Sequence, residues 1–142
     1  MSNYPPLPAP TPVAVRLFLG LDAVTDAVDD RVSIRLERPL PSIRIAKVGD
    51  QAASSEWEAV PMYQAEVWGR EFIPTEQLAW DIKNAWTSAE KQVFPDLGAV
   101  VHGRWIVQDP MTLPANDKDA DNTGMARFLV TVAFRLTGVI DG

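Results

Sequence analysis

The chain has 142 residues, of which 46% are hydrophobic and 23% charged, and its formal net charge is −6. These values are typical of one soluble globular domain. They argue against a protein that grips DNA by neutralising phosphates, because such proteins need a surplus of lysine and arginine. Since there is no cysteine, disulfide scaffolds, thiolate metal sites and cysteine nucleophiles are excluded. No apolar run approaches the ~20 residues of a membrane-spanning helix, and no secretory signal opens the chain, so we expect a protein made in a cytoplasm.

The first part of the chain predicts an arm followed by a helix. Residues 1–11 are rich in proline and carry no charge, so we expect an extended arm, either mobile or docked on a neighbouring subunit. Residues 12–142 then form a single α+β domain. Thr11 suits the cap of a helix and Pro12 its first position. Apolar residues at near-helical spacing extend this predicted helix over 12–27.

Two strands are predicted next. Residues 32–37 alternate apolar with polar side chains, as in a strand with one buried face. Pro39 and Pro41 interrupt this pattern, and a second strand runs from Ser42 to a turn at Gly49-Asp50. The small and polar residues that follow predict a loop.

The stretch 60–93 organises the rest of the prediction. A third strand places Tyr63, Ala65 and Val67 on one face and Met62, Gln64, Glu66 and Trp68 on the other, and Gly69 ends it. A helix starts near Pro74 and places its apolar residues at spacings of three and four. This stripe consists of Leu78, Ile82, Ala85, Trp86, Ala89 and Val93.

The C-terminal part predicts two strands around a long loop. Residues 101–108 alternate, and residues 127–136 alternate most cleanly of all. Between them, residues 109–125 contain four aspartates, and we expect this loop to become ordered only against a partner. The predicted fold class is α+β, with a mainly antiparallel sheet of about five strands and two helices packed on one face.

The search for catalytic chemistry yields little. His102 is the only histidine and lies within a strand pattern, where a surface or structural role is far commoner than catalysis. Nucleophile, phosphate-loop and metalloprotease motifs are absent. The loop at 117–124 resembles a calcium loop, but Asn122 and Phe128 stand where that motif has glycine and glutamate. We therefore predict neither an enzyme nor a cofactor nor a metal, and keep as the alternative a small cytoplasmic enzyme that uses His102 and the acidic loop.

The five tryptophans divide into two groups. Trp86 falls on the helix stripe and Trp105 on a strand face, so both are predicted to be core residues. Trp68 and Trp80 fall opposite the apolar faces of their elements. They predict either a protein–protein surface or partial burial beneath a loop.

Three stretches resemble tail terminator (tail completion) proteins of long-tailed bacteriophages. Residues 41–49 form a strand that opens after proline and closes on glycine. Residues 65–69 and 78–82 are a strand ending in tryptophan–glycine and the helix after it. Residues 121–128 lead into the terminal strand. Together the match spans about residues 12–137.

The resemblance implies a homo-oligomeric ring, typically a hexamer, at the head-facing end of the tail tube in the virion. Its partners would be the tail tube protein and the head–tail connector or stopper, with DNA passing through the lumen without specific binding. The alternative within the same assembly is another neck component, a head-completion or stopper protein. The candidate subunit or partner contacts are Arg35, Glu37, Glu66, Trp68, Trp80, Asp117, Asp119, Asp121, Arg127 and Arg135.

Overall fold

The computed structural model describes residues 5–51, 55–113 and 125–139. Its helices are α1 (Pro10–Leu19), α2 (Asp22–Val28), α3 (Phe72–Trp86) and the short 3-10 helix η1 (Pro95–Leu97). Its strands are β1 (Val32–Ser33), β2 (Ser42–Asp50), β3 (Glu58–Ala59), β4 (Pro61–Gly69), β5 (Gln92–Phe94), β6 (Ala99–Leu113) and β7 (Ala126–Gly138).

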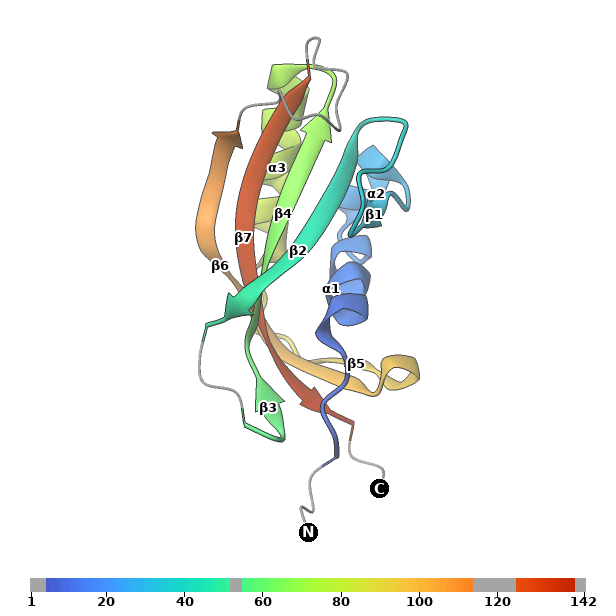
Figure 1. The fold of residues 1–142 in the computed structure, drawn as a ribbon, viewed down its shortest axis with the longest axis vertical. Helices are drawn as coiled ribbons and strands as arrows, with labels where there is room; N and C mark the ends of the chain where they lie inside the picture. The colour runs from blue at the N-terminus through green and yellow to red at the C-terminus, as the bar shows by residue number, and fades with distance from the viewer. Residues whose placement is uncertain (1–4, 52–54, 114–124, 140–142) are drawn as a thin grey trace.

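The strands form one mixed sheet in the order β1-β2-β4-β7-β6-β5, and β3 pairs with the far end of β7. The β1–β2 pair is parallel and the other pairs are antiparallel. The α1, α2 and α3 helices lie on one face of this curled sheet (Figure 1). The predicted α+β class is confirmed. The predicted mainly antiparallel sheet of about five strands with two helices needs two corrections. The short strands β1, β3 and β5 and the broken first helix add elements, and the sheet is mixed because β1 runs parallel to β2.

The centre of the fold is β4 with α3, as the sequence predicts. Tyr63, Ala65 and Val67 are fully buried on the face of β4 that the helices cover. From α3, Leu78, Ile82 and Trp86 pack into the same core. Each of these large side chains contributes roughly 1.5–3 kcal/mol by leaving water. The core is therefore a layer between the sheet and the helices.

The central helix is shorter than its apolar spacing predicts. It ends at Trp86 because the backbone of Thr87 is extended, with φ −66° and ψ 126°. The next residue forms a bridge to Arg104 of β6. Val93 belongs to β5 and is 48% exposed, so its place in the predicted stripe is wrong.

The predicted helix at 12–27 is two helices. Leu21, with φ −92° and ψ 121°, is extended and separates α1 from α2. The first helix starts at Pro10, after Ala9 and not after Thr11. The Thr11 hydroxyl instead lies 2.8 Å from the Tyr63 hydroxyl, which ties α1 to β4.

The N-terminal segment before α1 lies against the end of β7. A side chain at Gly138 would come within 2.5 Å of the Pro6 carbonyl oxygen and 3.1 Å of Pro5. Glycine is required there because the two backbones approach closely. The described ends of the chain therefore lie at the same end of the molecule (Figure 1).

Two of the predicted strands end at different residues in the structure. The strand predicted over 32–37 stops at Ser33, because β1 pairs with β2 at only two positions. Ile34 is consequently 61% exposed. In contrast, β6 continues through residues predicted as loop, up to Leu113. It accommodates Pro110 where its pairing with β7 shifts register between Gln108 and Met111, as expected of proline at a sheet edge or bulge.

Candidate functional site

A cluster of charged residues lies on the face of the sheet that no described helix covers. Glu66 of β4 sits at its centre, opposite Arg44 of the neighbouring β2. Arg44 donates to Glu66 Oε2 through Nε at 3.0 Å and Nη2 at 2.7 Å. Arg127 of β7 donates to Glu66 Oε1 at 2.9 Å. A single carboxylate thus binds two guanidinium groups from the strands on either side.

Trp68 completes this Glu66 cluster. Its indole Nε1 donates to Glu66 Oε2 at 3.2 Å. The guanidinium carbons of Arg44 and Arg127 lie 5.9 Å and 4.9 Å from its ring centroid, within the range of cation–π attraction. The side chains of Glu66, Arg44 and Arg127 are only 15–23% exposed to solvent. The cluster therefore joins β2, β4 and β7 with charge-assisted hydrogen bonds.

Of the two alternatives predicted for Trp68, a protein–protein surface or burial beneath a loop, the structure supports the second. Trp68 does lie opposite the helix-covered face, but it is completely buried. It packs with Leu40, and the partly buried Leu36 and Met125 cover them. Residues 34–37, which were predicted to continue a strand, belong instead to a loop, and Leu36 of this loop helps to cover Trp68.

The other candidate contacts are dispersed. Arg35 and Glu37 lie in the loop between β1 and β2, not on a strand. Trp80 is 38% exposed on α3, with Lys83 Nζ 5.6 Å from its ring. Arg135 is exposed and donates to Glu58 at 2.8 Å. The structure thus brings together Glu66, Trp68 and Arg127, whereas Asp117, Asp119 and Asp121 lie outside the described residues.

Sequence reasoning missed Arg44. The available signal was its polar position between Ile43 and Ile45 in an alternating strand, which places it on the same face as Glu66. Alternation assigns the face, but only the pairing of β2 with β4 places Arg44 beside Glu66.

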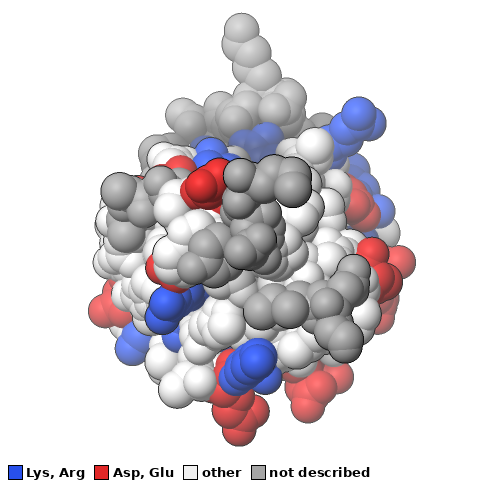
Figure 2. All heavy atoms as spheres, turned by 90° about the horizontal axis from the view of Figure 1, so that it is seen from below, with Lys and Arg blue, Asp and Glu red and all other residues white. Residues whose placement is uncertain are grey.

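His102 lies on β6, half-buried, with Nε2 2.8 Å from the Thr137 hydroxyl. Burial, together with Arg135 and Lys91, lowers the pKa of His102 below its usual value. A hollow of about 250 Å³ beside it is also lined by Pro5 and Gly138, at the end that carries the chain termini. Figure 2 views the molecule from this end, where charged side chains lie mainly around the rim. A neutral histidine bonded to a threonine between cations fits a structural role.

Trp105 was predicted to be a core residue, but it lies outside the core. It pairs with Ala133 on the helix-free face and is half-buried. Its indole nitrogen donates to the side-chain oxygen of Gln51. Trp86 is a core residue as predicted: it is fully buried, and its indole donates to the Ala133 carbonyl at 3.2 Å.

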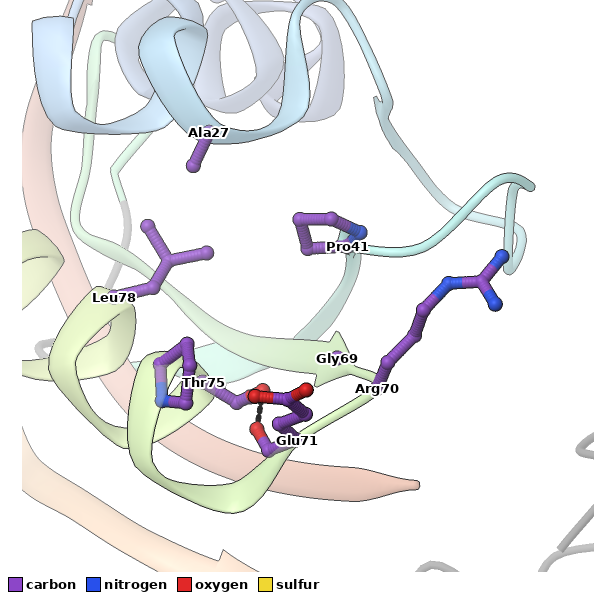
Figure 3. A pocket seen from close by; sticks show the side chains of 8 residues that line it. Ala27, Pro41, Gly69, Arg70, Glu71, Thr75 and Leu78 are labelled. Atoms are coloured by element: carbon purple, nitrogen blue, oxygen red, sulfur yellow. Dashed lines mark hydrogen bonds between the residues drawn. The ribbon is translucent and has the colours of Figure 1, made fainter. Parts of the chain in front are cut away.

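An apolar hollow lies between α2 and the start of α3 (Figure 3). It has a volume of about 380 Å³ and is lined mainly by Ala27, Pro41, Pro74 and Leu78. Ala27 and Leu78 face each other across it, while the Arg70 side chain extends away. A side chain on Gly69 would meet Thr75 Oγ1 at 1.8 Å, so glycine is needed for α3 to pack here. The lining offers apolar contact and no nucleophile–base pair.

Within residues 5–51, 55–113 and 125–139, no group of three or more histidine, aspartate or glutamate side chains is arranged to hold a metal ion. The calcium-like loop at 117–124 lies outside these ranges. None of the helices in the same ranges is both long and apolar enough to span a bilayer.

Comparison with known proteins gives a fold but no family. No family model and no curated protein matches the chain. A solved chain from a structure described as "Virion of native gene transfer agent (GTA) particle" matches with a TM-score of 0.56 and 16% sequence identity. The match covers 87% of this chain and 92% of that chain. This protein therefore shares the fold of a chain found in that virion over nearly the whole length of both.

Proposed function

We propose that this protein is a structural component of a phage-like virion, and more specifically a tail terminator. It assembles into a ring, typically a hexamer, on the head-proximal end of the tail tube. The ring stops tube polymerisation and provides the surface that joins the head–tail connector or stopper. DNA passes through the lumen without specific binding.

The observation that carries this proposal is the shared fold with the gene transfer agent virion chain. Its coverage matters more than its identity, because the two chains correspond along nearly their whole length and not over one common motif. The stretches that resemble tail terminators add to this. The first lies on β2, the second on β4 and α3, and the described residues of the third, 125–128, lead into β7. The strands β2, β4 and β7 are neighbours in the sheet.

The surface chemistry is consistent with assembly. Large apolar side chains are exposed on α3 and on both edges of the sheet, among them Ile73, Trp80, Val107, Ile34 and Val48. Exposed apolar side chains that recur on several sides of a small domain suit contacts with more than one partner. The net acidity suits a channel that lets DNA pass, since a basic lumen would retain it.

The test is to remove the protein from the particle that encodes it. Loss of a tail terminator leaves filled heads and separate tails whose tubes are overlong or unstable. Purified protein added back binds the head-proximal tube end and restores joining, as micrographs of labelled protein would record. Normal attached tails in the mutant contradict the proposal. Heads that leak DNA beside tails of normal, capped length favour a stopper or head-completion protein instead.

A further inference from the structure

Residues 5–8, the strap, continue the cover of the sheet beyond the helices. In Figure 1 the α1, α2 and α3 helices lie over the upper and middle parts of the sheet, and the end of β7 next to the C-terminus extends below them. The chain runs down from α1 past this end. Gly138 follows the buried Leu136 by two residues and therefore lies on the same, helix-covered face. The strap thus takes the place of a helix at this end of the sheet.

The strap meets the sheet at one closely fitted point. A β-carbon on Gly138 would lie 2.5 Å from the carbonyl oxygen of Pro6 and 3.1 Å from the ring of Pro5. The backbone of Gly138 does not have the positive φ that favours glycine, so an alanine would fit there if the strap were absent. The seat of the strap is therefore what requires glycine at this position.

On both sides of this seat the strap is loosely packed. A hollow of about 420 Å³ lies between the strap and the residues Leu97, Gly98 and Val139. A second hollow, of about 250 Å³, lies between Pro5 and the side of the sheet that carries His102. The contact at Gly138 therefore carries much of the attachment of the strap.

Within the part of the chain that the structure describes, no hydrogen bond joins the strap to the domain. Three of its four residues are proline and lack a backbone N–H, which leaves Leu7 as the only donor. Proline also limits the conformations that an open strap can adopt, so closing costs little entropy. A segment of this composition can stay seated by contact alone, without hydrogen bonds that would have to break when it opens.

The strap is joined to a firmly anchored helix by a short extended link. Ala9 is exposed and has an extended backbone, with φ −60° and ψ 129°. Two residues later, the Thr11 hydroxyl lies 2.8 Å from the Tyr63 hydroxyl, and Val13 is fully buried. Movement of the strap would therefore stop at Ala9 and leave α1 in place.

We infer that the strap opens at Ala9 and closes on Gly138 while the rest of the domain stays folded. Opening uncovers the end of the β6–β7 pair, where Ala99 lies opposite Gly138 on the same face. Ala99 is fully buried in the closed form. Local opening of this kind has a lower free energy than global unfolding, because few contacts are lost. The inference concerns the single subunit and does not depend on the proposed ring.

The absence of native cysteine allows a direct test in the full chain. Ala99→Cys places a thiol beneath the strap, and Ala65→Cys, equally buried at the centre of β4, is the matched control. In native buffer a maleimide labels the thiol at position 99 at least tenfold faster than the thiol at position 65. The labelling rate at position 99 stays nearly constant at low urea concentrations, whereas the rate at position 65 rises with urea, since only global unfolding exposes much surface.

A second measurement acts on the seat. Gly138→Ala pushes the strap off the sheet, so the Leu7 amide gains the fast motion of a free chain end in ¹⁵N relaxation, while the amide spectrum of β4 and α3 stays that of the folded domain. Gly103→Ala is the matched control, because its β-carbon would lie at an ordinary 3.6 Å from the Ser88 oxygen. It leaves Leu7 rigid.

Equal labelling rates with the same urea dependence at positions 99 and 65 overturn the inference, since the end of the sheet then opens only with the whole domain. A rigid Leu7 in the Gly138→Ala chain also overturns it. If Gly138→Ala does not fold, Pro5→Gly with Pro6→Gly loosens the strap without a change in β7. Unfolding of that variant as well means that the strap belongs to the cooperative fold, which contradicts the inference. None of these results bears on the proposed function, because no tail tube takes part in them.

Discussion

The helix-covered and helix-free faces of the sheet use the same strands but are stabilised by different interactions. On the covered face, β4 and β7 present only apolar or aromatic side chains, such as Tyr63 and Phe134, whose rings stack at 6.0 Å. On the free face, the same two strands meet through Glu66 and Arg127. One face depends on burial and tolerates exchange between apolar side chains of similar volume, whereas the other depends on a specific set of charges.

The largest expected effect comes from a charge on the covered face. Ile82→Asp removes a fully buried side chain worth roughly 1.5–3 kcal/mol and buries a carboxylate without a partner. We expect no soluble folded protein. Asn84→Asp, two residues along the same helix but exposed, is the matched control and melts normally. Similar melting temperatures for the two variants would show that α3 does not use this face for packing.

On the free face, Glu66→Ala leaves two largely buried guanidinium groups without their shared carboxylate. We expect a loss of about 2–4 kcal/mol in the free energy of unfolding, measured by urea denaturation. Glu58→Ala removes the partner of the exposed Arg135 and costs less than about 1 kcal/mol. If both variants lose the same amount, the Glu66 cluster is no more than a surface ion pair.

A smaller effect is expected where β4 joins α3. Gly69→Ala places a methyl group 1.8 Å from Thr75 Oγ1, and overpacking of this kind costs roughly 1–3 kcal/mol. Thr75→Ala in the same chain removes the clashing oxygen and recovers part of the loss. If Thr75→Ala relieves the clash, the double variant loses less free energy of unfolding than the two single variants lose together. A loss in the double variant that equals or exceeds that sum would contradict this explanation.

The smallest effect concerns pH. The folded-state pKa of His102 is lowered by burial and by Arg135 and Lys91, so the unfolded chain binds the proton more readily. The neutral histidine therefore favours folding fully above about pH 6.5, and this contribution is lost as pH falls below that value. His102→Gln should flatten the dependence of melting temperature on pH between about pH 5 and pH 7. An unchanged slope would contradict it.

Sequence patterns predict the covered face well and the edges poorly. The alternation through Tyr63 and the 3.6-residue spacing through Ile82 reflect burial against a continuous layer, so they carry over directly into the structure. The alternation of residues 32–37 has the same form, yet the chain stops pairing with β2 after Ser33 and leaves Ile34 exposed. Val93 fits the helical stripe, but the backbone turns at Thr87 before reaching it. A local sequence pattern does not show whether a neighbouring strand or helix is present for the segment to pack against.

The candidate contacts were predictable to a similar degree. Alternation places Glu66, Trp68 and Arg127 together on the free face, and the structure joins them. It does not indicate that Trp68 is covered, because the cover comes from the distant Leu40. For Arg35 and Trp80, exposure follows the sequence, and their docking on a second copy stays a prediction.

The close approach of the segment before α1 to Gly138 has a practical consequence for visualising the particle. Pro5 and Val139 line the same hollow, so the chain enters and leaves the domain at one pole. A small fluorescent or gold-binding fusion attached through either terminus would mark that pole in every copy. In the proposed ring all copies would share one polarity, so such a label would test which pole faces the capsid in a single set of micrographs. The α3 end would remain unobstructed throughout.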